Sequence, residues 1–167
     1  MGLLAERFSP KGPATIRLMV DRSVADALIA ALEAAPETGF ALRQRAMQAL
    51  DALPGYDWSG IYRLEGDTLH LDAYVGAATD HTEIPVGRGV CGTAVAENAN
   101  QVIDDVRELS NYLSCSAFTR SEIVVLIRDG EEILGQIDID GHTVGQFDAS
   151  DEQMLERLAD VLAVRWI

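Results

Sequence analysis

The chain has few basic residues. Lys and Arg number 13 against 27 Asp and Glu in 167 residues, so the formal net charge is −14. Phosphate backbones are bound by clustered Lys and Arg, and this deficit argues against nucleic acid and anionic membranes as partners. No apolar run approaches the roughly 20 residues of a membrane-spanning helix, and the first residues lack the pattern of a secretion signal. We therefore expect a cytoplasmic protein.

Cysteine is also scarce. The chain contains only Cys91 and Cys115, which are too few for the disulfide framework of a small secreted protein and show no C-x-x-C spacing. Reduced cysteine is among the most buried residue types, but it also carries redox chemistry. Composition alone leaves packing and redox chemistry both open.

The pattern of the chain predicts one α+β domain. Residues 1–20 show no clean period and contain prolines and a glycine, so we interpret them as an arm before a single domain over 21–167. Helical spacing of apolar residues predicts helices at 23–35, 38–53, 90–97 and from a cap at Ser150 onward. Alternating patterns predict strands at 58–64, 69–74, 84–86, 101–103, 122–128 and 132–140. We expect a central antiparallel sheet flanked by the N-terminal and C-terminal helices.

Carboxylates gather at one place in this predicted sheet. In the last strand the apolar face consists of Ile133, Gly135, Ile137 and Ile139. Alternation then puts Gln136, Asp138 and Asp140 on the opposite face. The Asp129-Gly130 hairpin brings Glu122 beside the end of that strand. Neighbouring carboxyls raise one another's pKa, so the group is either a solvated face or an acid site that works near neutral pH.

Three other motifs are weaker indications of a functional site. Residues 87–92 read G-x-G-x-x-G, but the helix that follows is too short for a dinucleotide-binding βαβ unit, so we expect a tight turn that opens a short helix. The acidic run at 138–141 lacks the spacing of a calcium loop. The histidines His70, His81 and His142 have no ligand spacing. We expect neither a metal ion nor a cofactor.

Two aromatic side chains share a face of the first predicted strand. Trp58 and Tyr62 lie four residues apart in an alternating segment. They are either ordinary core residues or a wall that holds the apolar part of a ligand, with the Tyr62 hydroxyl as a polar contact.

Four segments carry motifs of one known family. They are residues 57–62, 84–94, 121–124 and 135–140. The most specific features are the Gly-Val-Cys-Gly-Thr-Ala string around Cys91 and the interval from Cys115 to Glu122. Over about residues 40–163 the chain resembles the free methionine-(R)-sulfoxide reductases, which are stand-alone enzymes of the GAF fold.

The resemblance implies a thiol-dependent reduction of free L-methionine-(R)-sulfoxide to methionine. It implies that Cys115 attacks the sulfoxide sulfur and that Cys91 then forms a redox-active disulfide. The side chains that it places around the substrate are Glu122, Asp138, Asp140, Trp58 and Tyr62. It further implies regeneration by thioredoxin, a homodimer and a role in the repair of oxidative damage.

The chain departs from the family pattern at one cysteine. A third cysteine typically lies ten residues before the position of Cys91, and here that residue is His81. A GAF domain that binds a small ligand without turnover, or that senses redox state, is therefore the alternative function. Helix position alone favours Cys91 as the more acidic thiol, whereas the resemblance favours Cys115 as the nucleophile, with Arg120 offsetting the negative field nearby.

Overall fold

The computed structural model describes residues 20–113 and 116–167. Cys115 and residues 1–19 of the predicted arm therefore lie outside the described residues. The helices are α1 (Arg22–Glu33), α2 (Gly39–Asp51), α3 (Gly89–Glu97) and α4 (Ala149–Val164). The strands are β1 (Trp58–Glu65), β2 (Thr68–Val75), β3 (Glu83–Pro85), β4 (Gln101–Ile103), β5 (Ser121–Asp129) and β6 (Glu132–Gly141).

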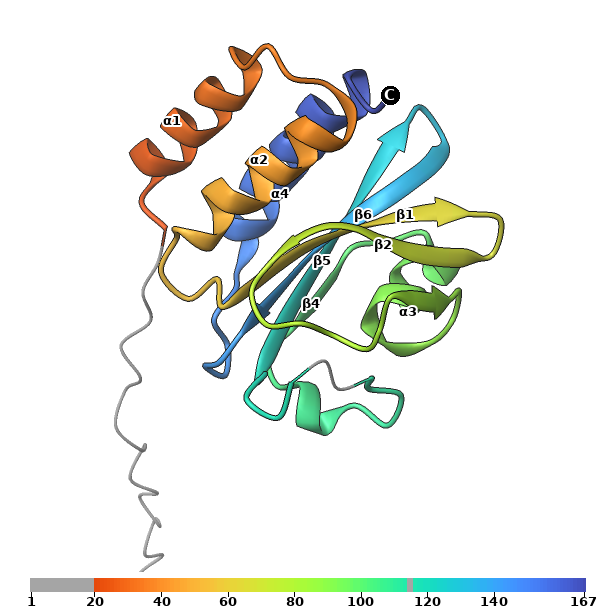
Figure 1. Ribbon diagram of the computed structural model, residues 1–167. Helices are drawn as coiled ribbons and strands as arrows, with labels where there is room; N and C mark the ends of the chain where they lie inside the picture. The colour runs from red at the N-terminus through yellow and green to blue at the C-terminus, as the bar shows by residue number, and fades with distance from the viewer. Residues whose placement is uncertain (1–19, 114–115) are drawn as a thin grey trace, which may run out of the picture.

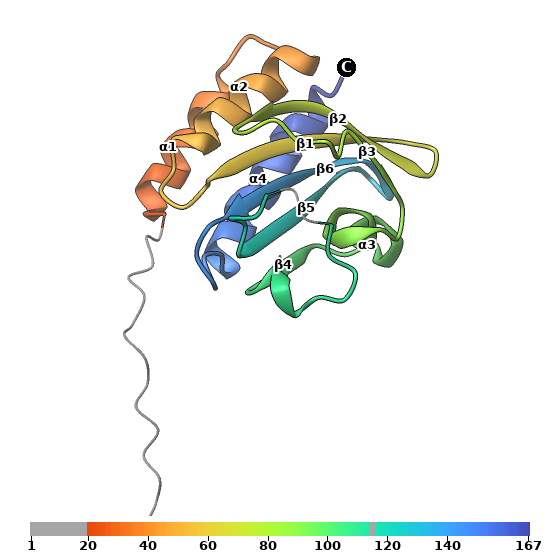
Figure 2. The same ribbon diagram turned by 60° about the horizontal axis from the view of Figure 1, so that its bottom comes forward.

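The six strands form one antiparallel sheet in the order β3-β2-β1-β6-β5-β4. Helices α2 and α4 cover one face of this sheet, with α1 beside them, and α3 lies against the other face together with the segment between β4 and β5 (Figures 1 and 2). The predicted α+β architecture, with terminal helices flanking a central antiparallel sheet, is confirmed.

Two apolar clusters occupy the two faces of the sheet. On the helical side, Ile61 of β1, Ile123 of β5 and Ile139 of β6 pack with α1, α2 and α4. On the other side, Trp58 and Tyr62 pack with residues of α3. The period-two pattern thus assigned the faces of β1 and of the C-terminal half of β6 correctly, because successive side chains of a strand point to opposite faces.

Two local expectations are wrong. Ile133 packs on the α3 side, and Leu134 packs on the helical side in its place. The β5–β6 register shifts between Ile127 and Arg128, and such a bulge reverses the alternation beyond it.

The predicted cap of the last helix is also wrong. Ser150 lies inside α4, and Asp148 is the N-cap in a capping box with Asp151. A carboxylate accepts the free N–H groups of a first turn as well as a hydroxyl does, so the helix begins two residues earlier. Among the described residues, no helix combines the length and the apolar character needed to cross a membrane.

Candidate active site

A row of side chains crosses the sheet on the α3 side at the end where β6 finishes. Asp140 of β6 pairs with Trp58 of β1 on one side and with Glu122 of β5 on the other. Glu122 in turn pairs with Ile103 of the edge strand β4. Asp138 lies one pleat further along β6, between Gly60 and Val124. The structure therefore brings the three predicted carboxyls together on one face.

These carboxyls are buried. Glu122 is 4% exposed, and Asp138 and Asp140 are each 1% exposed. Both carboxylate oxygens of Asp138 and one of Asp140 lack a hydrogen-bond partner among the described residues. Unpaired buried carboxylates cost free energy, so this arrangement favours bound protons or a bound cation.

Burial is the main cause of raised pKa values here. It raises the pKa of Asp138 to about 6, partly offset by the neighbouring Cys91 and Glu122 side chains. It raises the pKa of Glu122 well above its ordinary value, and the charges of Asp138 and Asp140 raise it further. The pKa of Asp140 also lies well above its ordinary value, through burial and the charge of Asp138. The solvated-face alternative is therefore wrong, and the use of this group as an acid stays a prediction.

Helix α3 brings Cys91 to these carboxyls. Cys91 is 4% exposed, and its Sγ donates to Glu122 Oε1 over 4.0 Å. The first turn of α3 packs tightly on the turn before it, since a Cβ at Gly92 would lie 2.5 Å from the Pro85 carbonyl oxygen. The 87–92 glycines therefore serve a tight turn that opens a short helix, as predicted.

The glycine motif at 87–92 and the acidic run at 138–141 do not have the structures of a dinucleotide site and a calcium loop. The strand that follows α3, β4, pairs antiparallel with β5, so the glycine motif is not part of a βαβ unit. Residues 138–141 are the end of strand β6 and form no calcium loop. One group of potential metal ligands does exist among the described residues: Cys91, Glu122 and Asp138 each offer an atom within 4.8 Å of the other two.

The segment before β5 reaches the same site. Cys115 lies outside the described residues, so its position relative to Cys91 stays a prediction. Thr119, which is buried, donates its hydroxyl to Asp140 Oδ2 over 3.3 Å. Arg120 is paired with Asp105 at 2.8 Å, an ion pair that helps to lower the pKa of Asp105. The guanidinium that was expected to offset the field around the thiol is thus engaged with Asp105.

The two aromatic residues line the β1 side of the site. The Trp58 ring lies over Gly60, where a Cβ would come within 2.2 Å of it, and its Nε1 donates to the Ala77 carbonyl over 3.0 Å. Tyr62 is fully buried and donates its hydroxyl to the carbonyl oxygen of His81 over 2.9 Å. The backbone of His81 therefore holds the Tyr62 side chain in place.

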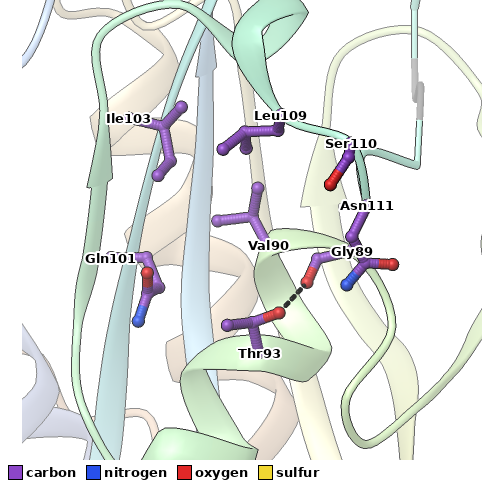
Figure 3. Close-up of a pocket in the computed structure, with 8 residues that line it drawn as sticks. All are labelled: Gly89, Val90, Thr93, Gln101, Ile103, Leu109, Ser110 and Asn111. Carbon is purple, nitrogen blue, oxygen red and sulfur yellow. Dashed lines mark hydrogen bonds between the residues drawn. The ribbon is translucent and has the colours of Figure 1, made fainter.

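An open pocket adjoins the carboxyls on the β4 side. It has a volume of about 280 Å³ and lies between α3, β4 and the residues that follow the 3-10 helix Val106–Glu108. Figure 3 shows Val90, Ile103 and Leu109 lining its apolar part, while Thr93 is turned to the Gly89 carbonyl. Ile103 pairs with Glu122 and Val90 precedes Cys91, so the pocket lies next to the acid site.

Sequence reasoning missed two polar residues of the site. Thr119 belongs to an irregular segment, and no periodicity indicates where its hydroxyl lies. Gln136 was placed on the carboxylate face but was given no role, although its amide is fully buried beside Tyr62 and Leu126. The signal available in the sequence was a glutamine within the otherwise apolar part of a predicted strand.

Comparison with known proteins identifies the family. The GAF domain family matches residues 41–166. The chain is 42% identical to the free methionine-R-sulfoxide reductase of Escherichia coli (strain K12) over 126 residues, which are 74% of this chain and 76% of that protein.

Two solved structures agree with this match. The free methionine-R-sulfoxide reductase of Neisseria meningitidis, in complex with its substrate, has a TM-score of 0.82 at 30% identity and covers 91% of this chain and 95% of its own. The type II enzyme of Thermoplasma acidophilum has a TM-score of 0.71 at 38% identity, with 86% and 94% covered. The chain therefore belongs to the GAF-fold family of free methionine-R-sulfoxide reductases and is an oxidoreductase.

Proposed function

We propose that this protein reduces free L-methionine-(R)-sulfoxide to methionine in the cytoplasm and that thioredoxin restores its thiols. The observation that carries the proposal is the cluster of three buried carboxyls, two of which lie close to Cys91, on the face of the sheet where Trp58 also packs. Its support from known proteins is the 42% identity to the reductase of Escherichia coli.

The two kinds of carboxyl have different tasks in this proposal. At neutral pH Asp138, with a pKa of about 6, is mostly ionised and holds the ammonium group of the amino acid. Burial and the charges of Asp138 and Asp140 raise the pKa of Glu122 well above its ordinary value, which favours its protonated form, and we assign to Glu122 the proton that the departing sulfoxide oxygen takes up. Asp140 has a pKa that burial also raises and accepts a hydrogen bond from Thr119, so it is the second candidate for this proton. Paired carboxyls with separated pKa values are the usual sign of such a division.

The reaction requires two thiols. The Cys115 sulfur attacks the sulfoxide sulfur, the S–O bond breaks, and the oxygen ends on Cys115 as a sulfenic acid while methionine leaves. The Cys91 thiolate then attacks the sulfenic sulfur, and a disulfide forms with loss of water. Two thioredoxin thiols reduce this disulfide and become oxidised themselves. With His81 at the third position, Cys91 is the one remaining thiol in the sequence that can resolve Cys115.

A coupled assay tests the function. NADPH consumption with thioredoxin and thioredoxin reductase is measured on free R sulfoxide, free S sulfoxide and peptide-bound sulfoxide. We expect turnover of the free R epimer alone, and none in the Cys91→Ser/Cys115→Ser double variant. Absence of turnover with both thiols reduced, together with a rise in melting temperature on adding the sulfoxide, would instead establish a GAF domain that only binds its ligand. Gel filtration of the same samples tests the expected homodimer.

The Trp58 wall gives a second prediction. In Gly60→Ala the added Cβ meets the Trp58 ring at 2.2 Å, and overpacking of this kind lowers the free energy of unfolding by about 1–3 kcal/mol. The displaced ring no longer lines the site, so KM for the sulfoxide should rise severalfold. Ser59→Ala is the matched control, because Ser59 is the adjacent residue and points to the other face of β1. Unchanged stability and KM in Gly60→Ala would show that Trp58 does not form the wall.

A further inference from the structure

Gln136 is an unusual residue for its place in the fold. It lies in β6 between Tyr62 of β1 and Leu126 of β5, with its side chain in the apolar cluster on the α3 side. The residue is fully buried, and neither its Nε2 nor its Oε1 has a hydrogen-bond partner within residues 20–113 and 116–167. A leucine of similar length would fill this position without that penalty.

The free-energy cost of burying the unpaired Gln136 amide indicates that a ligand binds there. An unpaired buried polar group lowers the stability of the fold, and a bound molecule that supplies the missing partners removes this cost. An amide offers N–H donors at one atom and an acceptor at the other. The partner therefore carries both an acceptor and a donor, close together.

The neighbours of Gln136 indicate which part of a ligand meets it. Asp140, Asp138 and Gln136 follow one another along the same face of β6, at intervals of about 6.8 Å between Cα atoms. The thiol of Cys91 contacts Glu122, and atoms of Cys91, Glu122 and Asp138 lie within 4.8 Å of one another, so the reacting sulfur belongs beside these two carboxyls. The amino-acid head group then extends along β6 past Asp138 toward Gln136.

We propose that Gln136 is a specificity-determining residue whose Nε2 donates to the α-carboxylate of the free amino acid, while its Oε1 accepts from the ammonium group. The inference rests on the proposed function. It supplies a neutral donor for the carboxylate in a pocket lined by acidic side chains, where Nη2 of Arg120 is engaged with Asp105. A peptide-bound residue has an amide in place of this carboxylate and forfeits the charge-assisted hydrogen bond.

Binding to a chain that cannot turn over tests the assignment. In the Cys91→Ser/Cys115→Ser background, which removes both thiols of the sequence, calorimetry measures Kd for free methionine-(R)-sulfoxide and for its decarboxylated analogue, 3-(methylsulfinyl)propan-1-amine. Adding Gln136→Leu should weaken binding of the free amino acid about 10- to 100-fold. Binding of the analogue should change far less, since it has no carboxylate.

Controls separate this inference from the function itself. Gln153→Leu, on the exposed side of α4, should change neither Kd, and Gln136→Met replaces Gln136→Leu if the latter fails to fold. Equal weakening for both compounds, or none for either, would overturn the role of Gln136 while leaving the reductase function intact. If the thiol-free chain binds neither compound and the wild-type chain has no turnover, the proposed function has failed as well.

Discussion

Replacing Cys115 by serine is expected to abolish the reduction of free methionine-(R)-sulfoxide, the first turnover included. A serine hydroxyl is a far weaker nucleophile toward sulfur than a thiolate and cannot accept the oxygen as a sulfenic acid. The measurement is the methionine released in a single turnover without reductant. Wild type should release about one methionine for each chain, and Cys115→Ser should release none.

Cys91→Ser is the matched variant. Its first turnover should equal that of wild type, because Cys115 still attacks, but steady-state turnover with thioredoxin should fall steeply, since the sulfenic acid has no partner thiol. The contact of Cys91 with Glu122 is also compatible with Cys91 as the nucleophile, and the same experiment tests that assignment. Loss of the first turnover in Cys91→Ser and its survival in Cys115→Ser would mean that Cys91 is the nucleophile.

Glu122→Gln is expected to lower kcat by about 100- to 10,000-fold, the usual range for loss of a general acid. The amide keeps the shape of the side chain but has no acidic proton to give to the departing oxygen. The measurement is kcat and KM with thioredoxin at saturating concentration. A kcat within a factor of three of wild type would assign the proton to another carboxyl, with Asp140 as the next candidate.

Asp138→Asn separates charge from acidity in the same cluster. Its main effect should be on KM, because the role proposed for Asp138 is to hold the ammonium group, whereas Glu122→Gln should act on kcat. Its thermal stability should also change with pH. The pKa of Asp138 is about 6 in the folded chain against an ordinary 3.8, so its stabilising contribution is complete below pH 3.8 and is lost as the pH rises to about 6.

The variant should therefore melt at the same temperature as wild type near pH 4 and several degrees higher at pH 7. Thermal unfolding across this range is the measurement, and Asp26→Asn, on the exposed part of α1, is the control. A variant that is no more stable than wild type at pH 7 would show that Asp138 does not carry a buried charge there.

Much of the site follows from local pattern. The period-two alternation of β6 placed Asp138 and Asp140 on one face, and the Asp129-Gly130 turn placed Glu122 beside the end of β6. The bulge then decided that Glu122 pairs with Asp140, because the register at the turn alone would pair it with Ile139. The same logic failed at Ile133, where the bulge reverses the faces. A bulge depends on how the whole sheet packs, and no pattern in the six or eight neighbouring residues indicates where it lies.

By itself, the sequence determined the order of the helices and strands, the two faces of the central strands and the convergence of three carboxyls at one end of the sheet. These are consequences of side-chain period and of short connections, which are local. Only the tertiary structure decided that the carboxyls are buried with raised pKa values, that Cys91 contacts Glu122, that Arg120 pairs with Asp105, and that the Gln136 amide lies unpartnered among the described residues. Burial and pairing depend on which distant segments pack over a face, and here those segments are α3 and the residues leading into β5.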